Sequence, residues 1–178
     1  MLGHLLLLQF LFTPVEAPEL TQVKEVIAQR SRLLGHPLSE PWVTELAVSA
    51  MNERGSISLP VILAIVEVES KYDRKAKSKR RCKGYMQLSP ATAKSVARKL
   101  GIRNPNLFHT KTNMTLGIRY LAMLLEENGS LGQALTIYNM GYRNFAKNKK
   151  KVSKYALLVI KRSKKIKGLL ENNLTCKR

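Results

Sequence analysis

One carboxylate lies where a soluble helix would normally bury an aliphatic side chain. The segment 60–70 is rich in apolar residues that recur at the spacing of a single helical face, namely Ile62, Ile65 and Val66. Glu69 continues that face one turn later. Because burial disfavours the charged form, the pKa of Glu69 is expected to rise, and a carboxylic acid still protonated near neutral pH can act as a general acid. The alternative is that Glu69 ends the helix and turns toward water or a nearby cation.

The elements that would position this carboxylate are predicted to be helices. Helical periodicity dominates the chain, and no alternating run is long enough to form a substantial sheet. Helices are expected at residues 20–34, 41–53, 60–71, 91–100, 112–128, 131–138 and 152–167. The longest irregular stretch, 72–88, begins just after Ser70, so we expect it to form one wall of a cleft beside Glu69. The predicted fold class is therefore mainly α, with a long loop region beside a helical body.

The composition is that of one basic domain. The chain has 178 residues, with 31 Lys and Arg against 12 Asp and Glu, and a net charge of +19. Most of this charge lies in two blocks, +7 within residues 71–83 and +12 within residues 143–178. An anionic partner is therefore expected. A nucleic acid is one alternative, but only 6% of the residues are aromatic and no helix-turn-helix, zinc-binding or base-stacking pattern accompanies the charge.

Residues 1–17 differ from the rest of the chain. An apolar run from Leu5 to Phe12 is followed by Val15-Glu16-Ala17, a small-x-small pattern. This arrangement predicts a secretory signal peptide, and the run is too short to span a bilayer. The usual cationic start is missing, so the alternatives are a start further upstream or an interfacial anchor.

The two cysteines, Cys82 and Cys176, are compatible with one disulfide in an oxidising compartment and equally with two unpaired residues. His4, His36 and His109 are scattered along the chain, so neither residue type shows metal-ligand spacing. We therefore expect no metal and no cofactor.

Four short strings occur in order along the chain. They are Glu69-Ser70, the Gly-Tyr-Met-Gln-Leu run at 84–88, Asn113 with Gly117, Tyr120 and Leu121, and the Tyr-Asn-Met-Gly run at 138–141. Together they resemble the soluble lytic transglycosylase (SLT) domain, a lysozyme-like family that cleaves peptidoglycan, and the match extends to Tyr155-Ala156. The resemblance implies a compact lysozyme-like α+β fold, mainly α, with a long loop or small hairpin beside the cleft. It covers a catalytic domain at 58–160. The periodicity predicts N-terminal helices at 18–57 before this domain, and the charge predicts a basic C-terminal tail at 161–178 after it.

The resemblance implies a lyase reaction with one catalytic carboxyl group. Glu69 would protonate the oxygen joining N-acetylmuramic acid to N-acetylglucosamine, then take a proton from the muramic C6 hydroxyl, which closes onto C1 as a 1,6-anhydro product. Hydrolytic glycosidases usually need two carboxylates. Here Glu67 is expected on the other side of the helix, and Asp73 is interpreted as a cap or loop-ordering residue. The alternatives are a muramidase that uses water and a catalytically silent wall-binding protein.

Substrate-binding residues are implied where the sequence matches the family strings. Gln87 is expected to hydrogen-bond a sugar, and Met86 beside it to make an apolar contact unless Met86 is simply core. Tyr138 is expected to orient the Glu69 carboxyl group. Asn139 is expected to bind an acetamido group.

Other positions support the resemblance less directly. Ser70 either forms a hydrogen bond near the sugar or satisfies its own backbone, whereas Asn113 and Gly117 are expected to cap and pack their helix. Arg81 and Cys82 stand where the family usually has glycine and alanine. Glycine permits backbone angles that arginine disfavours, which leaves open a different path for the loop.

The expected partners are peptidoglycan glycan strands, together with anionic cell-envelope polymers bound through the basic patches. The expected location is the periplasm, the outside of the cell or a virion. The sequence does not choose among wall turnover, a secretion or conjugation machine, and viral entry.

Overall fold

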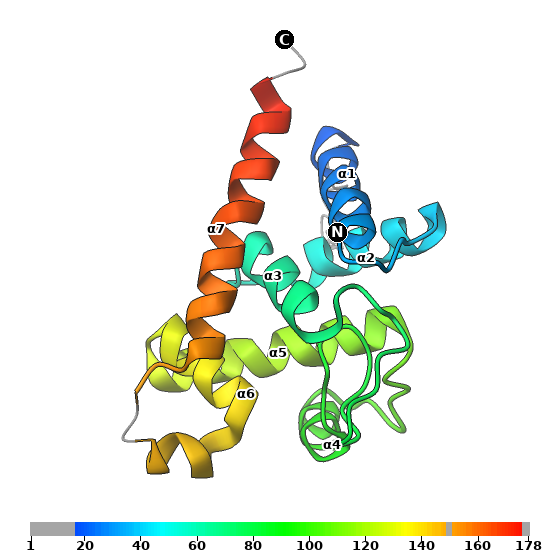
Figure 1. Cartoon of the computed structure of the whole chain (residues 1–178). Coiled ribbons are helices and arrows are strands. Elements are labelled where there is room, and N and C mark those ends of the chain that lie inside the picture. Colours follow the sequence, from blue (N-terminus) through cyan, green and yellow to red (C-terminus); the bar gives the residue numbers. More distant parts are fainter. Residues whose placement is uncertain (1–16, 149–150, 176–178) are drawn as a thin grey trace, which may run out of the picture.

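The computed structural model describes residues 17–148 and 151–175. Within these ranges the chain forms seven helices (Figure 1): α1 (Ala17–Leu33), α2 (Glu40–Glu53), α3 (Leu59–Ser70), α4 (Pro90–Lys99), α5 (Thr110–Asn128), α6 (Leu131–Lys147) and α7 (Lys154–Thr175). Among the described residues, β structure is limited to isolated bridges of Lys83 with Lys77 and with Leu88. The mainly α prediction is therefore confirmed, with a small hairpin-like region in the loop after α3.

Two expectations about location concern the start of the chain. The predicted signal peptide lies outside the described residues except for Ala17, which begins α1. No helix in the described part of the chain is long and apolar enough to cross a bilayer. The location of the protein stays a prediction.

Helix α3 lies at the centre of the molecule (Figure 1). Ser58 precedes it in an extended conformation, and Pro60 occupies its first turn, where a helix has no use for the missing N–H. Nearly every residue from Leu59 to Glu67 is buried, as expected for a helix that is apolar on all sides. Its most extensive contacts are with α7, and it also packs against α1 and α2. This packing fixes the position of its last turn, which carries Glu69.

Two apolar cores divide the molecule into two lobes. The larger core is built from α1, α2, α3, α5, α6 and α7. The smaller core lies between α4, its flanking loops and α5, and consists of Leu88, Ala93, Val96, Ala97, Leu107 and Leu116. Tyr120 of α5 and Tyr138 of α6 pack against both cores. These two tyrosines therefore mark the junction between the lobes.

The predicted helix bounds hold better in the first part of the chain than in the last. The first five helices begin and end within about three residues of expectation, the usual uncertainty of helix ends. Helix α6 continues past residue 138, although a non-helical Gly141 (φ 76°, ψ 159°) kinks it. Helix α7 continues to Thr175 and buries Ile166, so the described part of the expected basic tail is a packed helix. The domain boundaries themselves stay predictions.

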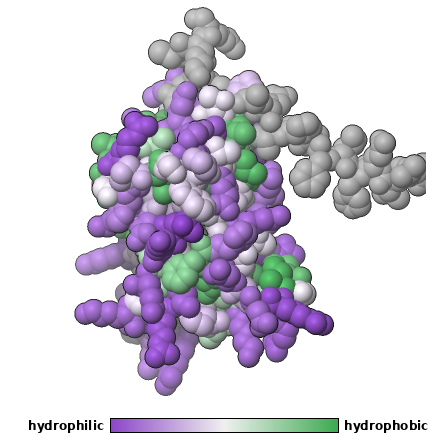
Figure 2. All heavy atoms as spheres, turned by 90° about the vertical axis from the view of Figure 1, so that its right-hand side faces the viewer, coloured by the Kyte–Doolittle hydropathy of each residue, from purple (hydrophilic) through white to green (hydrophobic). Residues whose placement is uncertain are grey.

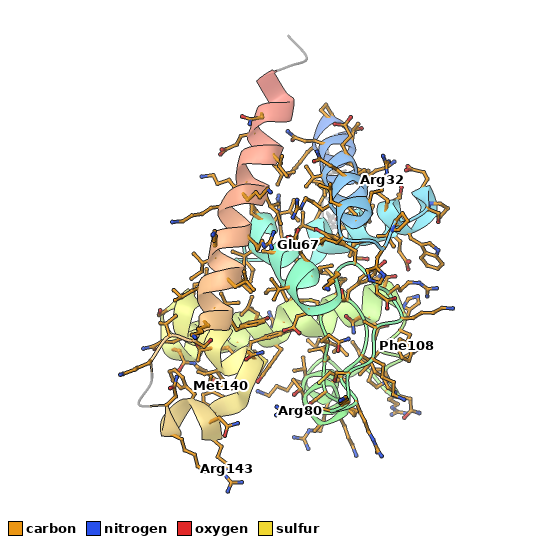
Figure 3. All side chains as sticks on the ribbon, viewed as in Figure 1. Arg32, Glu67, Arg80, Phe108, Met140 and Arg143 are labelled. Atoms are coloured by element: carbon orange, nitrogen blue, oxygen red, sulfur yellow. The ribbon has the colours of Figure 1, made fainter. Side chains whose placement is uncertain are left out.

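Glu67 connects the first and last helices to α3 (Figure 3). Its carboxylate accepts hydrogen bonds from Nε and Nη2 of Arg30 in α1, at 2.8 and 2.7 Å. Nη1 of Arg162 in α7 lies 3.2 Å from the same carboxylate. Arg30 and Glu67 are both buried, and Arg30 would be an unpaired buried charge without Glu67. The N-terminal helices therefore buttress the body of the protein.

Candidate active site

Glu69 lies in the last turn of α3 and is partly buried. Burial raises the pKa of its carboxyl group to about 7. Oη of Tyr155 donates a hydrogen bond to Oε1 of Glu69 at 2.6 Å, and this bond acts in the opposite direction by stabilising the ionised form. The effect of burial is the larger of the two. The rise in pKa that the helical face predicted is confirmed, and both protonation states are populated near neutral pH.

Tyr155, in the first turn of α7, is the residue that orients this carboxyl group. Burial and the neighbouring Glu69 raise the pKa of its phenol well above the ordinary value, so its hydroxyl stays a hydrogen-bond donor. Because Tyr155 contacts Oε1, the second carboxyl oxygen is left for another group. The sequence assigned the orienting role to Tyr138, and that assignment is wrong. Tyr138 donates its hydroxyl to the carbonyl oxygen of Met86 instead, at 2.8 Å.

Tyr138 nevertheless lies close to the candidate site. Its ring packs against Tyr120, with centroids 5.3 Å apart, at the junction between the lobes. Burial, and after it the charge of Glu69, raises the pKa of Tyr138. Tyr138 therefore joins α6 to the loop that carries Met86, in the neighbourhood of the carboxyl group.

The loop after Glu69 begins with two residues in the left-handed region. Lys71 and Tyr72 have φ angles of 52° and 67°, and this conformation ends α3. Tyr72 is fully buried and anchors the start of the loop in the larger core. Oδ1 of Asp73 accepts a hydrogen bond from the N–H of Lys75 at 2.8 Å, in line with its interpretation as a loop-ordering residue. Left-handed conformations are unfavourable for residues other than glycine, so the surrounding packing must maintain this turn.

Arg81 adopts a left-handed backbone conformation, which glycine reaches more easily than arginine. Its φ angle is 63°. Its N–H donates to the carbonyl of Ser78 at 2.9 Å, and the N–H of Ser78 donates to the carbonyl of Cys82 at 3.0 Å, which closes a tight turn. The loop therefore has a glycine-like turn at this point, with an arginine held in a strained conformation.

Asn113 of α5 holds the segment 84–88 against the helical body. Its Oδ1 accepts the N–H of Met86 at 2.8 Å, and its Nδ2 donates to the carbonyls of Lys83 and Leu107 at 2.9 and 3.0 Å. Gly84 has no room for a side chain, because a Cβ there would lie 2.4 Å from the Leu107 carbonyl oxygen. Asn113, expected to cap or pack its own helix, instead positions the loop.

Two of the predicted substrate-binding residues point inward. Met86 is fully buried, and it packs so closely on α5 that a Cβ on Gly117 would lie 2.4 Å from its Sδ. Ser70 is buried and donates its hydroxyl to the carbonyl of Val66 at 2.9 Å. Met86 is therefore a core residue, and the Ser70 hydroxyl binds the backbone of its own helix. This corrects the prediction that these two residues bind the substrate.

Two more of the five predicted residues, Gln87 and Asn139, keep exposed surface. Gln87 is partly exposed, and its Nε2 donates to the carbonyls of Ala76 and Gly84, both at 3.0 Å. Asn139 is exposed on α6. Gln87 thus fastens the loop through its amide nitrogen and has its amide oxygen for other contacts, while the whole amide of Asn139 is accessible.

Among the described residues, this region holds neither a disulfide nor a group of side chains suited to a metal ion. Cys82 is partly exposed and forms no disulfide with any described residue, while Cys176 lies outside the described residues. In the part of the chain that the structure describes, no three His, Cys, Asp or Glu side chains are grouped to hold a metal ion.

Comparison with known proteins identifies one family. The model of the transglycosylase SLT domain matches residues 47–158. This range includes Glu69 and the loop after it, the helices α4, α5 and α6, and Tyr155. The matched segment therefore contains both Glu69 and Tyr155, whose hydroxyl binds the Glu69 carboxyl group.

Solved structures of lytic transglycosylases share the fold. An inactive variant of the lytic transglycosylase Slt from Pseudomonas aeruginosa, in which glutamine replaces a glutamate, matches 72% of this chain with 29% identity and a TM-score of 0.52. The 70-kDa soluble lytic transglycosylase of Escherichia coli matches 85% of this chain with 20% identity and a TM-score of 0.53. A complex of the 70-kDa soluble lytic transglycosylase with bulgecin A gives 20% identity and a TM-score of 0.54. This chain spans only 22% of the first protein and 29% of the other two.

Proposed function

This chain belongs to the transglycosylase SLT domain family, and on that premise we propose that it is a peptidoglycan lytic transglycosylase with Glu69 as its only catalytic acid and base. The bond cleaved is the β-1,4 linkage from N-acetylmuramic acid to N-acetylglucosamine. The observation that carries the proposal is the Glu69 carboxyl group, partly exposed at a helix end and with a pKa of about 7. Such a group can give up a proton and take one back at the same pH.

The reaction proceeds in two proton transfers. In the first, protonated Glu69 gives its proton to the glycosidic oxygen while the bond from that oxygen to C1 of the muramic sugar breaks. In the second, the Glu69 carboxylate takes the proton of the muramic C6 hydroxyl while the C6 oxygen forms a bond to C1. The product is a 1,6-anhydro sugar. Glu69 regains its proton and no water is consumed.

The carboxylates that neighbour Glu69 in the sequence have structural roles. Glu67 is held by Arg30 and Arg162, and Asp73 accepts the backbone N–H of Lys75. Neither of them is therefore free to be the second carboxylate that a hydrolase usually needs. This favours the C6 hydroxyl of the substrate over a water molecule as the nucleophile.

Three further residues have proposed roles around the reacting bond. Tyr155 is a positioning residue, because its hydroxyl holds Oε1 of Glu69 and leaves Oε2 for the glycosidic oxygen. Gln87 would accept a hydrogen bond from a sugar hydroxyl through its amide oxygen. Asn139, exposed on α6, would pair its amide with an acetamido group.

The decisive test replaces Glu69 with glutamine, which keeps the shape of the side chain and removes the acid. In the similar Slt protein, a variant with the same type of exchange is described as inactive. Glu69→Gln should lower the release of soluble fragments from purified sacculi by about 100- to 10,000-fold, while the protein still binds the wall. Glu126→Gln, at an exposed position of α5, is the matched control and should retain activity.

Mass spectrometry of the products separates the candidate reactions. Anhydromuropeptides from the unaltered protein support the transglycosylase, reducing ends indicate a muramidase, and intact sacculi indicate a wall-binding protein. Full activity in Glu69→Gln would refute the assigned acid. The proposed substrate places the enzyme in the periplasm, outside the cell or on a virion, where its basic blocks would hold it on anionic envelope polymers.

A further inference from the structure

A groove beside α4 gathers cations from three parts of the smaller lobe. Its volume is about 1100 Å³. Lys83 reaches it from the loop before α4, Lys94 and Arg98 lie one turn apart on α4, and Arg103 comes from the loop after α4. Lys94, Arg98 and Arg103 are exposed. We call the space that these four residues line the basic groove.

No carboxylate of this part of the chain offsets the charge. Thirteen Lys and Arg but no Asp or Glu occur between Asp73 and Glu126. Among the described residues, the Lys and Arg side chains that form ion pairs belong to α1, to α7 and to Arg54, which follows α2. None of these cations lies in this segment. Figure 2 shows a predominantly hydrophilic surface over the lower part of the molecule. The described residues that line the basic groove therefore include no acidic side chain, and the groove would attract an anion from outside the chain.

The lining of the groove indicates which anion fits. Between the cations, Pro90, Ala91 and Ile102 contribute exposed or partly exposed aliphatic surface, while Ala93, Ala97 and Leu107 line the groove as buried members of the smaller core. No aromatic side chain occurs among the described residues that line it, and the Lys83 ammonium lies over the neighbouring Phe108 ring, 5.4 Å from its centroid, so the groove itself has no platform for stacking of nucleic-acid bases. Such a surface suits a chain of phosphates joined by short aliphatic units, because cations neutralise the phosphates and the apolar floor contacts the linkers.

We propose that the basic groove binds an anionic phosphodiester polymer of the cell envelope, of the poly(glycerol phosphate) type. The choice of an envelope polymer over a nucleic acid rests partly on the proposed function, since that function brings the protein to the cell wall. The groove is distinct from the active site, because none of Glu69, Gln87 and Tyr155 lines it.

Lys83 connects the basic groove to the active site, because its backbone pairs with Leu88 at the end of the loop that carries Gln87. A polymer in the groove would hold this loop next to the wall.

The test measures binding of the full chain to purified poly(glycerol phosphate) at several salt concentrations. The groove variant carries Lys94→Gln, Arg98→Gln and Arg103→Gln. The control variant carries Lys161→Gln, Lys164→Gln and Lys165→Gln, three exposed residues of α7, and loses the same charge. We expect the groove variant to bind about tenfold or more weakly and its salt slope to fall by about two, because roughly 0.7 counterions are released per phosphate contact. The control should bind nearly as tightly as the unaltered protein.

Two results would overturn the proposal. Equal losses in both variants would mean that net charge, not the groove, binds the polymer. Tighter binding of single-stranded DNA of matched charge, lost in the groove variant, would make the site a nucleic-acid site. The measurement contains no peptidoglycan, and Glu69→Gln should bind the polymer normally. Failure of the groove and failure of the proposed reaction are therefore distinguishable.

Discussion

Two features of its surroundings shift the pKa of Glu69 in opposite directions. Burial at the end of α3 raises it, and the hydroxyl of Tyr155 lowers it. A carboxyl group with burial alone would hold its proton too firmly to serve as a base, and a fully solvated one would be ionised before it could serve as an acid. At the scale of the residue, the catalytic property therefore belongs to the pair and not to Glu69 alone.

Tyr155→Phe should separate the two effects. The activity of the unaltered protein should fall as the pH rises through about 7, because the protonated form of Glu69 starts the reaction. Loss of a hydrogen bond to the carboxylate disfavours the ionised form by about 1.5–3 kcal/mol, which raises the pKa by about one to two units. We therefore expect the alkaline limb of the kcat/KM profile to move to higher pH, measured as fragment release from sacculi.

The matched control for this shift is Tyr138→Phe, which removes a hydroxyl that contacts a backbone carbonyl of the loop. Its alkaline limb should stay in place even if overall activity falls. An unmoved limb in Tyr155→Phe would show that the Tyr155 hydroxyl does not hold the carboxyl group in the working enzyme.

The two members of this pair differ in how far the sequence could predict them. Glu69 is marked by a local signal, the spacing of apolar residues within its own helix. Tyr155 lies 86 positions away, and its contact forms only when α7 packs on α3. The sequence included Tyr155 in a matching string, but spacing along the chain could not show which tyrosine reaches the carboxyl group. For the same reason it could not tell that Met86 points inward.

At the scale of the element, the helix starts and ends that matched their predictions carry local signals. Ser89, for example, accepts the N–H of Thr92 and caps α4, with proline following it. The end of α7 was misjudged because its lysines resemble a solvated tail, while Leu169 and Leu170, beyond the predicted end, pack against the larger core. Gly141 kinks α6 without ending it, and its neighbours on both sides remain helical.

The loop after α3 offers a direct test of its strained turn. Arg81→Gly should raise the free energy of unfolding by up to about 1 kcal/mol. The left-handed conformation costs about 1–2 kcal/mol in arginine, and glycine removes this cost. Part of the stabilisation is cancelled because glycine also gives the unfolded chain more conformational freedom. Arg80→Gly removes the same charge where φ is not positive, and should lower stability by about 0.5–1 kcal/mol. Urea unfolding measures both. Equal losses in the two variants would contradict a strained Arg81.

At the scale of the whole molecule, charge and packing are distributed unequally between the lobes. The smaller core has six buried apolar residues, and the lobe around it carries the segment without acidic residues. The larger core joins six helices, and the buried pair of Arg30 and Glu67 lies beside it. The smaller lobe therefore combines the weaker apolar stabilisation with the stronger internal repulsion. On the proposed function, the same charges that repel one another would attract the protein to an anionic cell wall.

This imbalance predicts that the smaller lobe opens first and that salt closes it. Amides of α4 and of residues 101–109 should exchange their hydrogens several-fold faster than those of α3, because segments with few buried apolar contacts open locally at a lower free energy.

Raising the salt from about 0.01 M to about 1 M shortens the screening length from about 30 Å to about 3 Å. Exchange in α4 should then slow, while α3, whose buried pair is little screened, serves as the internal control. Hydrogen exchange followed by mass spectrometry measures both segments in one sample. Equal protection of α3 and α4 at low salt would mean that the two cores unfold as one unit.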